Sequence, residues 1–427
     1  MNPENKAPHT TPVKGRVSGV EVALVGLAFS FFALAGSQGE ARPLVVYALL
    51  LTWLLAVLAV GLTQRPWLAA GYLLALGIII RLAYLAERRM GSDVLSVTWE
   101  AIDVTLDGGN PYTHTYAQSI PPGQNPFAYP PGNLLFYLPG FLLGDVRATE
   151  IFSSAVVLVG LIWAAWLIRN DWPIAAMGVY AAAPSLIALA TDNSNDTSAG
   201  ALLFVSALLL LLARRQSSAW LLLLAALAMG EALAFKLYML PFWPFFIAYL
   251  ASQHWRLSWA SSPNRTLTVP AWLAYAGASA AFVAVVTLPF FLRSPQGFVD
   301  SLTTWSSASI HPIAGWNVWA FLGSWRGWDI EGALGENLSR IDVGLMAAAI
   351  VIGLLLGVRR PSRALLMGVG VWFVLMFFAR WTTYAYFAGV APVVLIIPFA
   401  DRLVERPEGH VEAERPAPAP IRANPPW

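Results

Sequence analysis

The sequence predicts an all-α integral membrane protein with about twelve transmembrane helices and two long extracytoplasmic loops. Of its 427 residues, 57% are hydrophobic and only 12% are charged, whereas about 25% of a soluble domain is charged. The mean hydropathy is +0.61, and apolar runs of roughly 17 to 23 residues recur, which is the length that a bilayer demands of a helix. The net charge of +2 and the lack of a P-loop lysine motif argue against nucleic-acid or nucleotide binding.

The predicted spans account for most of the chain. They lie near residues 20–36, 43–63, 67–86, 149–168, 172–190, 197–213, 218–235, 237–252, 270–292, 342–358, 363–379 and 383–400. No convincing small-residue cleavage site follows the first run, so we expect it to remain as an uncleaved span. The transmembrane domain then covers 20–400, between an N-terminal tail at 1–19 and a Pro-rich, charged tail at 401–427 whose composition predicts disorder.

The basic residues predict the orientation of these spans. If the N-terminus is cytoplasmic, 16 of the 26 Lys and Arg residues fall on the cytoplasmic side. Short cytoplasmic loops carry this excess of positive charge in membrane proteins. We therefore expect a multi-pass plasma-membrane protein with both termini in the cytoplasm.

Two connections are much longer than the others, at residues 86–148 and 293–341, and the orientation places both outside the cell. Loops of this length in a compact protein are usually functional or disordered. Both are rich in aromatic residues, which argues against disorder. We expect them to fold back onto the membrane surface and to form one roofed cavity with a lateral opening for a lipid substrate.

The first long loop begins with a predicted amphipathic helix that ends at the "GGNP" stop signal. At 100° per residue, one face carries Asp93, Glu100, Asp103 and Asp107, and the opposite face carries Leu95, Trp99, Ile102 and Leu106. Such a helix lies in the headgroup layer, where exposed acids are ordinarily just solvated. Asp93 differs because it lies where the third span leaves the membrane and can point over the protein. The run "NLLFYLPGFLLG" at 133–144 is too short to span and is interfacial or re-entrant.

The same loop resembles a known family. The elements "SD", "LDGGNPY" and "FAYPPGNLLFYLP" are similar to those of the polytopic GT-C glycosyltransferases, especially the family 87 polyprenyl-phosphate-mannose-dependent mannosyltransferases. The resemblance implies inverting transfer of a sugar, mannose in that family, from a polyprenyl-phosphate donor to a lipid or glycan acceptor, with Asp93 as the catalytic base. We expect Asn110, Tyr112 and Tyr129 in the matched elements to bind substrate. Asp93 has no adjacent second acid, so the role of a divalent metal stays open and we assign no metal ligand.

The departing phosphate is a stable anion that needs no proton, but it should meet cations. The outward-facing candidates are Lys236, Arg293, His311, Arg326 and Arg380. Of these we expect Lys236, with Arg293 or His311, to bind the donor phosphate. The alternatives are that Lys236 only snorkels at a span boundary and that His311 is inert. Trp316 and Asn317, close to His311, offer an aromatic platform and an amide for a sugar.

Two further polar features lie near the spans. Asp192 and Asn193 belong to a polar cluster between the fifth and sixth spans, either as a turn with Asp196 or Thr197 as the helix N-cap or as binding residues for the acceptor sugar. Glu231 lies deep in a span, where a charge costs about 2.5–3.5 kcal/mol on insertion scales. We expect it to pair with Lys236 or Arg81.

A secondary transporter or a lipid-linked-sugar flippase is the alternative function, because about twelve spans is a common transporter count. Transporters place ionisable residues near the membrane midplane and contain structural repeats. Here the polar and aromatic residues concentrate in the two outer loops, and residues 1–213 and 214–427 show no repeat. The sequence thus favours an enzyme whose partners are the lipid-linked donor, the acceptor and membrane lipids, with no nucleic acid.

Overall fold

The computed structural model describes residues 65–86, 92–119, 127–262, 265–304, 313–335 and 337–405. Within these ranges, seven helical stretches are long and apolar enough to cross a membrane. They are α3 (Pro66–Ala86), α6 (Arg147–Ile168), α9 (Asp196–Gln216), α12 (Ala271–Arg293), α16 (Asn337–Leu355), α17 (Pro361–Phe378) and the stretch Tyr384–Val404. The described chain therefore has the make-up of an all-α membrane protein. The predicted spans at 20–36 and 43–63 lie outside the described residues.

Shorter apolar segments fill the spaces between these helices. They are α7 (Trp172–Ala182), α8 (Pro184–Leu189), α10 (Ala219–Phe235), the short 3-10 helix η1 (Leu237–Met239) and α11 (Phe242–Ser252). The last stretch, Tyr384–Val404, is itself divided into α18 (Tyr384–Gly389), α19 (Ala391–Ile396), η2 (Ile397–Phe399) and α20 (Ala400–Val404). Several spans that the sequence predicts as single helices are thus built from two or more pieces.

One such break explains the position of Arg81. The predicted span at 172–190 is interrupted at Ala183, whose backbone is extended (φ −64°, ψ 126°), because a residue that precedes proline avoids helical geometry. The fully buried Arg81 donates hydrogen bonds to the carbonyls of Tyr180 at 2.9 Å and Ala181 at 3.1 Å. Arg81 thus satisfies backbone groups that the break leaves without helical partners, and the expectation that it pairs with Glu231 is wrong.

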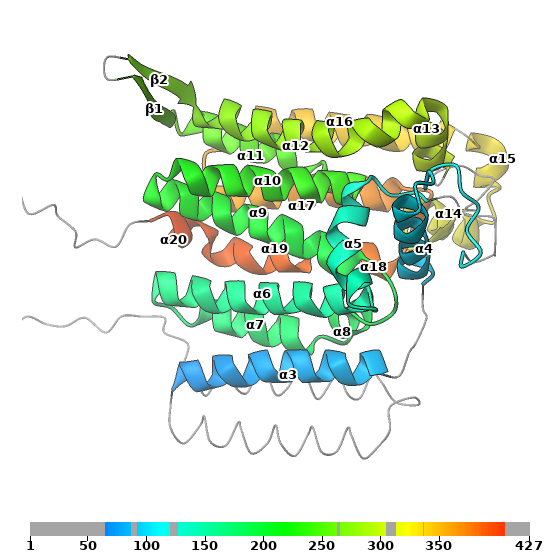
Figure 1. Ribbon diagram of the computed structural model, residues 1–427, viewed down its shortest axis with the longest axis horizontal. Coiled ribbons are helices and arrows are strands. Elements are labelled where there is room, and N and C mark those ends of the chain that lie inside the picture. Colours follow the sequence, from blue (N-terminus) through cyan, green and yellow to red (C-terminus); the bar gives the residue numbers. More distant parts are fainter. Residues whose placement is uncertain are drawn as a thin grey trace, which may run out of the picture.

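The long helices lie side by side, and the two ends of the bundle differ (Figure 1). At one end, α4 (Val94–Leu106) and α5 (Gly132–Leu142) run across the direction of the spans, and α13 (Pro295–Thr304), α14 (Val318–Arg326) and α15 (Ile330–Leu334) gather nearby. We call this the α4 end. The antiparallel hairpin of β1 (Arg256–Ser262) and β2 (Arg265–Pro270) marks the opposite end, the hairpin end. The two long connections of the sequence therefore meet at one end of the bundle.

A short parallel ladder ties the second connection to the last spans. It joins β3 (Ala314–Gly315) to β4 (Trp381–Thr382), with Ala314 paired to Trp381 and Gly315 to Thr382. A Cβ atom at Gly315 would lie 1.9 Å from the carbonyl oxygen of Thr382, so this close approach requires glycine. The ladder holds the segment before α14 against the junction between α17 and α18.

The core is centred on α9. Of its apolar window, 83% is buried, compared with 11% in α12 and α16, so α9 is enclosed by other helices while α12 and α16 expose apolar surface. A Cβ atom at Gly200 would lie 1.8 Å from the carbonyl oxygen of Gly389. Only glycine therefore lets α18 pack directly on α9, and this contact places Gly389 against Asp196.

The predicted amphipathic helix is present as α4. Leu95 and Ile102 are buried, and the Trp99 ring lies 4.4 Å from that of Phe141 in α5, centroid to centroid. Leu106, by contrast, is 58% exposed. The apolar face of α4 therefore packs on the protein along its first three turns and faces outward only at its last residue.

Candidate active site

A cavity of about 410 Å³ opens at the α4 end beside the break between α10 and η1. Its polar lining comprises Tyr129, Lys236, Tyr238, Ser339, Asp342, Arg380 and Tyr386, and its apolar lining includes Leu302, Val343, Met346, Leu375 and Met376. Of the apolar residues named, Val343 and Met346 belong to α16 and Leu375 and Met376 to α17, and α16 is one of the least buried spans. We call this the Lys236 cavity. It combines a cationic, aromatic region with an apolar wall.

Lys236 occupies the break itself. Helix α10 ends at Phe235, and Lys236 adopts an extended backbone (φ −148°, ψ 121°). Its ammonium nitrogen Nζ lies 2.6 Å from Oδ1 of Asp196, and the residue is only 6% exposed. A buried charge requires such a partner. The sequence-based pairing of Lys236 with Glu231 is therefore wrong.

Three aromatic rings surround the same ammonium group. The Lys236 Nζ atom lies 4.8 Å from the ring centroid of Tyr238, 5.3 Å from that of Tyr386 and 5.7 Å from that of Tyr129. All three distances are within the range of cation–π attraction. The hydroxyl of Tyr238 also donates to Oδ1 of Asp196. The lysine is thus held in one place by a carboxylate and a ring cage.

Two more carboxylates lie close to this ion pair. Oδ2 of Asp192 accepts a hydrogen bond from the Tyr384 hydroxyl at 2.6 Å, and burial raises the pKa of Asp192 above its ordinary value. Glu150 of α6 is buried and accepts hydrogen bonds from the hydroxyls of Tyr137 and Ser198. Glu150 therefore ties α5 and α6 to the first turn of α9, next to Asp196.

Asp93 opens α4 at the edge of this region. Its carbonyl accepts the first helical hydrogen bond from the Val97 N–H at 2.9 Å. Burial, followed by the charges of Tyr386, Asp196 and Asp93, raises the pKa of the Tyr129 phenol well above its ordinary value. Tyr129 lines the Lys236 cavity, whereas Asp93 is not among its lining residues.

Asn193, which the sequence assigns to substrate binding, fixes the start of α4. Asn193 has a left-handed backbone (φ 71°), and its Nδ2 donates to the Ser92 carbonyl at 2.7 Å and to Oγ of Ser96 at 3.0 Å. These bonds fix the start of α4 and hence the place of Asp93. Asn193 lies outside the lining of the Lys236 cavity.

Asn110 and Tyr112 hold the backbone of Tyr129 through hydrogen bonds. Oδ1 of Asn110 accepts from the Tyr112 N–H at 3.0 Å, which makes a local turn. The hydroxyl of the buried Tyr112 donates to the Tyr129 carbonyl at 2.8 Å. The "NPY" and "YPP" elements of the sequence therefore contact each other, and of these three residues Tyr129 lines the cavity.

The described candidate residues from the second long loop lie outside the lining of the Lys236 cavity. The Arg293 guanidinium donates to the carbonyls of Gly108 and Gly109 at the end of α4 and does not line the Lys236 cavity. Asn317 caps α14 by accepting from the Ala320 N–H at 2.8 Å, while the Trp316 ring is 66% exposed. His311 lies outside the described residues.

The structure adds residues that sequence reasoning missed. Tyr238 and Tyr386 complete the ring cage, and Asp342 lines the cavity with its Oδ1 atom buried and without a hydrogen-bond partner among the described residues. An ionisable residue inside a span is a functional candidate by default, which is the signal that would have found Asp342. The described residues contain no group of three or more His, Asp or Glu side chains able to hold a metal.

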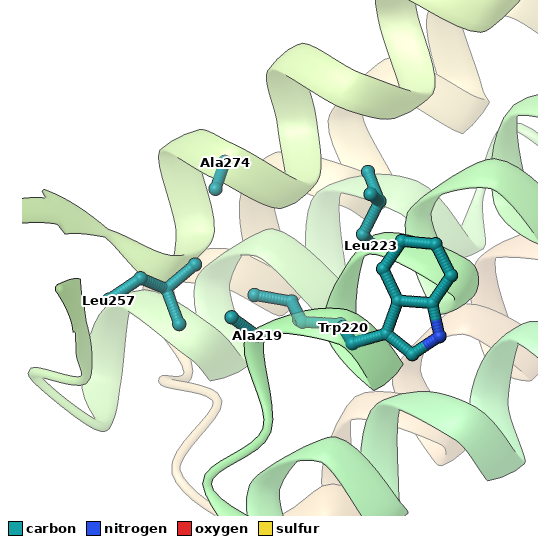
Figure 2. A pocket seen from close by; sticks show the side chains of 6 residues that line it. Ala219, Trp220, Leu223, Leu257 and Ala274 are labelled. Atoms are coloured by element: carbon teal, nitrogen blue, oxygen red, sulfur yellow. The ribbon is translucent and has the colours of Figure 1, made fainter. Parts of the chain in front are cut away.

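A second hollow, at the hairpin end, has a different character. It encloses about 290 Å³ between α10, β1 and α12. Figure 2 shows Trp220 and Leu223 of α10 together with Leu257 of β1 and Ala274 of α12. All of its lining residues are apolar, so this hollow offers no side chain for acid–base or phosphate chemistry.

Comparison with known proteins gives no family assignment. The chain matches no protein-family model, and no curated protein matches it. Function must therefore be argued from the site.

Proposed function

We propose that the chain is an inverting glycosyltransferase of the GT-C type, similar to family 87. It moves a sugar, which we take to be mannose, from a polyprenyl-phosphate donor to a lipid or glycan acceptor. The observation that carries the proposal is the Lys236 cavity, in which a caged cation adjoins an apolar wall. A lipid-linked phosphate complements both regions, because its phosphate is an anion and its lipid chain is apolar.

The donor fits this cavity by its chemistry. Its phosphate would lie near Lys236, and Arg380, whose guanidinium is paired with Glu331, provides a second cation in the lining. Cations and fixed donors of this kind stabilise the charge that develops on a departing phosphate. The polyprenyl chain would lie along Val343 and Met346 of α16, a helix with little burial against other spans.

Asp93 supplies the one base that the reaction needs. It takes the proton of the acceptor hydroxyl while that oxygen forms a bond to the anomeric carbon, and the bond from this carbon to the phosphate oxygen breaks. The phosphate leaves as a stable anion and requires no acid. Glycosidases need a second carboxyl group because their leaving group is an alcohol.

The membrane arrangement belongs to the same proposal. We infer about twelve spans, cytoplasmic termini, and a site on the outer face of the plasma membrane. Arg214 and Arg215 lie at the end of α9 away from the cavity, where Arg215 donates to the carbonyl of Leu167 at 3.3 Å. Basic residues at that end agree with a cytoplasmic location.

A donor assay tests the proposal. Membranes that contain the protein are given a polyprenyl-phosphate donor with radiolabelled mannose and extracted lipids and glycans as acceptors. We expect label to move from the donor into a new product. Loss of label from one leaflet without formation of a product would support the flippase alternative. That alternative is favoured by Asp342 inside a helix, whose buried Oδ1 has no hydrogen-bond partner among the described residues. A donor that neither reacts nor moves would overturn the proposal.

A further inference from the structure

A groove of about 650 Å³ lies between α4, the loop at residues 117–118 and the turn from α5 to α6. Polar side chains provide much of its lining, including Ser96, Asp103, Gln118, Arg147 and Asn193, and the Trp99 indole lies among them. We call this the α4 groove. It differs from the Lys236 cavity because it has no long apolar wall.

We propose that the α4 groove binds the hydrophilic glycan portion of the acceptor, an inference that rests on the proposed glycosyltransferase function. Sugar rings offer many hydroxyl groups and apolar C–H faces. Carboxylate, amide and guanidinium groups match the hydroxyls as acceptors and donors, and an indole matches the apolar face. A lipid tail would find no comparable surface here.

Part of the lining is already used to build the groove. Glu100 accepts from the ring nitrogen of His114 at 3.0 Å and from the backbone N–H groups of Ala117 and Gln118 at 3.3 Å each. These bonds hold the loop against α4. Arg147 is paired with Asp145 at 2.6 Å. The exposed side chains of Asp103 and Gln118 are therefore the lining groups best placed to contact a sugar.

The position of the groove explains how an acceptor meets the donor. Ser96 and Asn193 line the groove and are bonded to each other at 3.0 Å. Ser96 follows Asp93 by three residues, a helical rise of about 4.5 Å. Asp93 is not among the lining residues of either hollow, but the hydrogen bonds from Asn193 to Ser92 and Ser96 fix the start of α4 at the groove. We therefore place Asp93 beside the groove, where it can take the proton of an acceptor hydroxyl bound there.

Binding of a soluble mannotriose probe to the purified protein tests this inference, with affinity measured by NMR titration. The combined change Asp103→Ala and Gln118→Ala should weaken mannotriose binding by at least about tenfold, since it removes hydrogen bonds to a charged and a neutral group. Asp107→Ala is the matched control, because Asp107 is exposed directly after the same helix and is not among the groove residues. It should bind mannotriose as the unchanged protein does.

The outcomes separate this inference from the proposed function. Failure of the unchanged protein to bind mannotriose, or equal affinity in the double variant and the unchanged protein, overturns the groove assignment. Mannotriose binding that depends on Asp103 and Gln118, without any transfer from the lipid donor, supports the groove and counts against the proposed transferase. In an active preparation, we expect the double variant to raise the acceptor KM and to leave the donor KM unchanged.

Discussion

The two ends of the bundle are built from the same spans but carry different chemistry. At the hairpin end, the hollow beside Trp220 is wholly apolar (Figure 2), and Arg215 bonds to backbone carbonyls at helix ends. At the α4 end, short helices cross the bundle (Figure 1), and the buried pair of Lys236 and Asp196 lies within a ring cage. Of these two hollows, the one at the α4 end has the polar lining.

The physical reason lies in the backbone. A continuous helix satisfies its own N–H and C=O groups and can cross a bilayer with apolar side chains alone. Where a helix breaks, polar groups are freed, and fixed side chains can be placed beside them. The break at Lys236 and the junction at Thr382 both occur at the α4 end. The site is therefore built where helices of the membrane-spanning bundle break.

The sharpest test of the comparison is the side of the membrane on which each end lies. The chain has no cysteine, so single cysteines can be introduced as Thr115→Cys at the α4 end and Gln216→Cys at the hairpin end, both at exposed positions. We expect an impermeant maleimide to label Thr115→Cys in intact cells and to label Gln216→Cys only after permeabilisation. The reverse pattern would place the Lys236 cavity in the cytoplasm and contradict the proposed topology.

The next effect concerns Asp93 at the α4 end. Asp93→Asn keeps the shape of the side chain and removes its basicity, so sugar transfer should fall by at least about 100-fold, the usual scale for a general base. The control Asp107→Asn removes an acid from the exposed end of the same helix and should leave the rate unchanged. Near-normal transfer by Asp93→Asn, in a protein with an unchanged melting temperature, would mean that another group is the base.

A smaller effect distinguishes Lys236 from Arg293, two of the three residues that the sequence assigns to the donor phosphate. Lys236→Met leaves Asp196 as an unpaired buried charge and should cost about 3–5 kcal/mol of unfolding free energy, together with donor binding. Adding Asp196→Asn should restore much of the stability but not the donor affinity, as measured by thermal unfolding and donor titration.

Arg293 provides the comparison for Lys236. Its guanidinium holds the Gly108 and Gly109 carbonyls at an exposed site, so Arg293→Ala should cost about 1 kcal/mol of unfolding free energy and leave donor affinity unchanged. If donor affinity instead falls with Arg293→Ala and survives in Lys236→Met, the phosphate binds outside the Lys236 cavity.

Much of the fold follows from local sequence. Apolar runs of sufficient length predict the seven long helical stretches, and the alternation of acids and apolar residues predicts α4. The breaks are harder to predict, because Pro184 restrains only its neighbour and nothing local shows that Arg81, about 100 residues earlier, binds the freed carbonyls. Lys236 and Tyr129 both line the cavity. The sequence assigns Lys236 from its place between two apolar runs and Tyr129 from the family resemblance, in neither case with the partners that hold it.

The sequence by itself determined the class of protein, the main helices and the placement of polar residues in a few segments, because hydropathy and helical periodicity depend on residues that are near in the chain. Tertiary structure alone decided that Asp196 pairs with Lys236 and that Tyr238 and Tyr386 surround the ammonium group. It also decided that Arg293 donates hydrogen bonds to carbonyls at the end of α4. Tyr238 is a near neighbour of Lys236 in the chain, but the other contacts join residues 40 to more than 180 positions apart. A charged side chain inside a membrane protein must find a partner, but which partner it finds depends on how the helices pack.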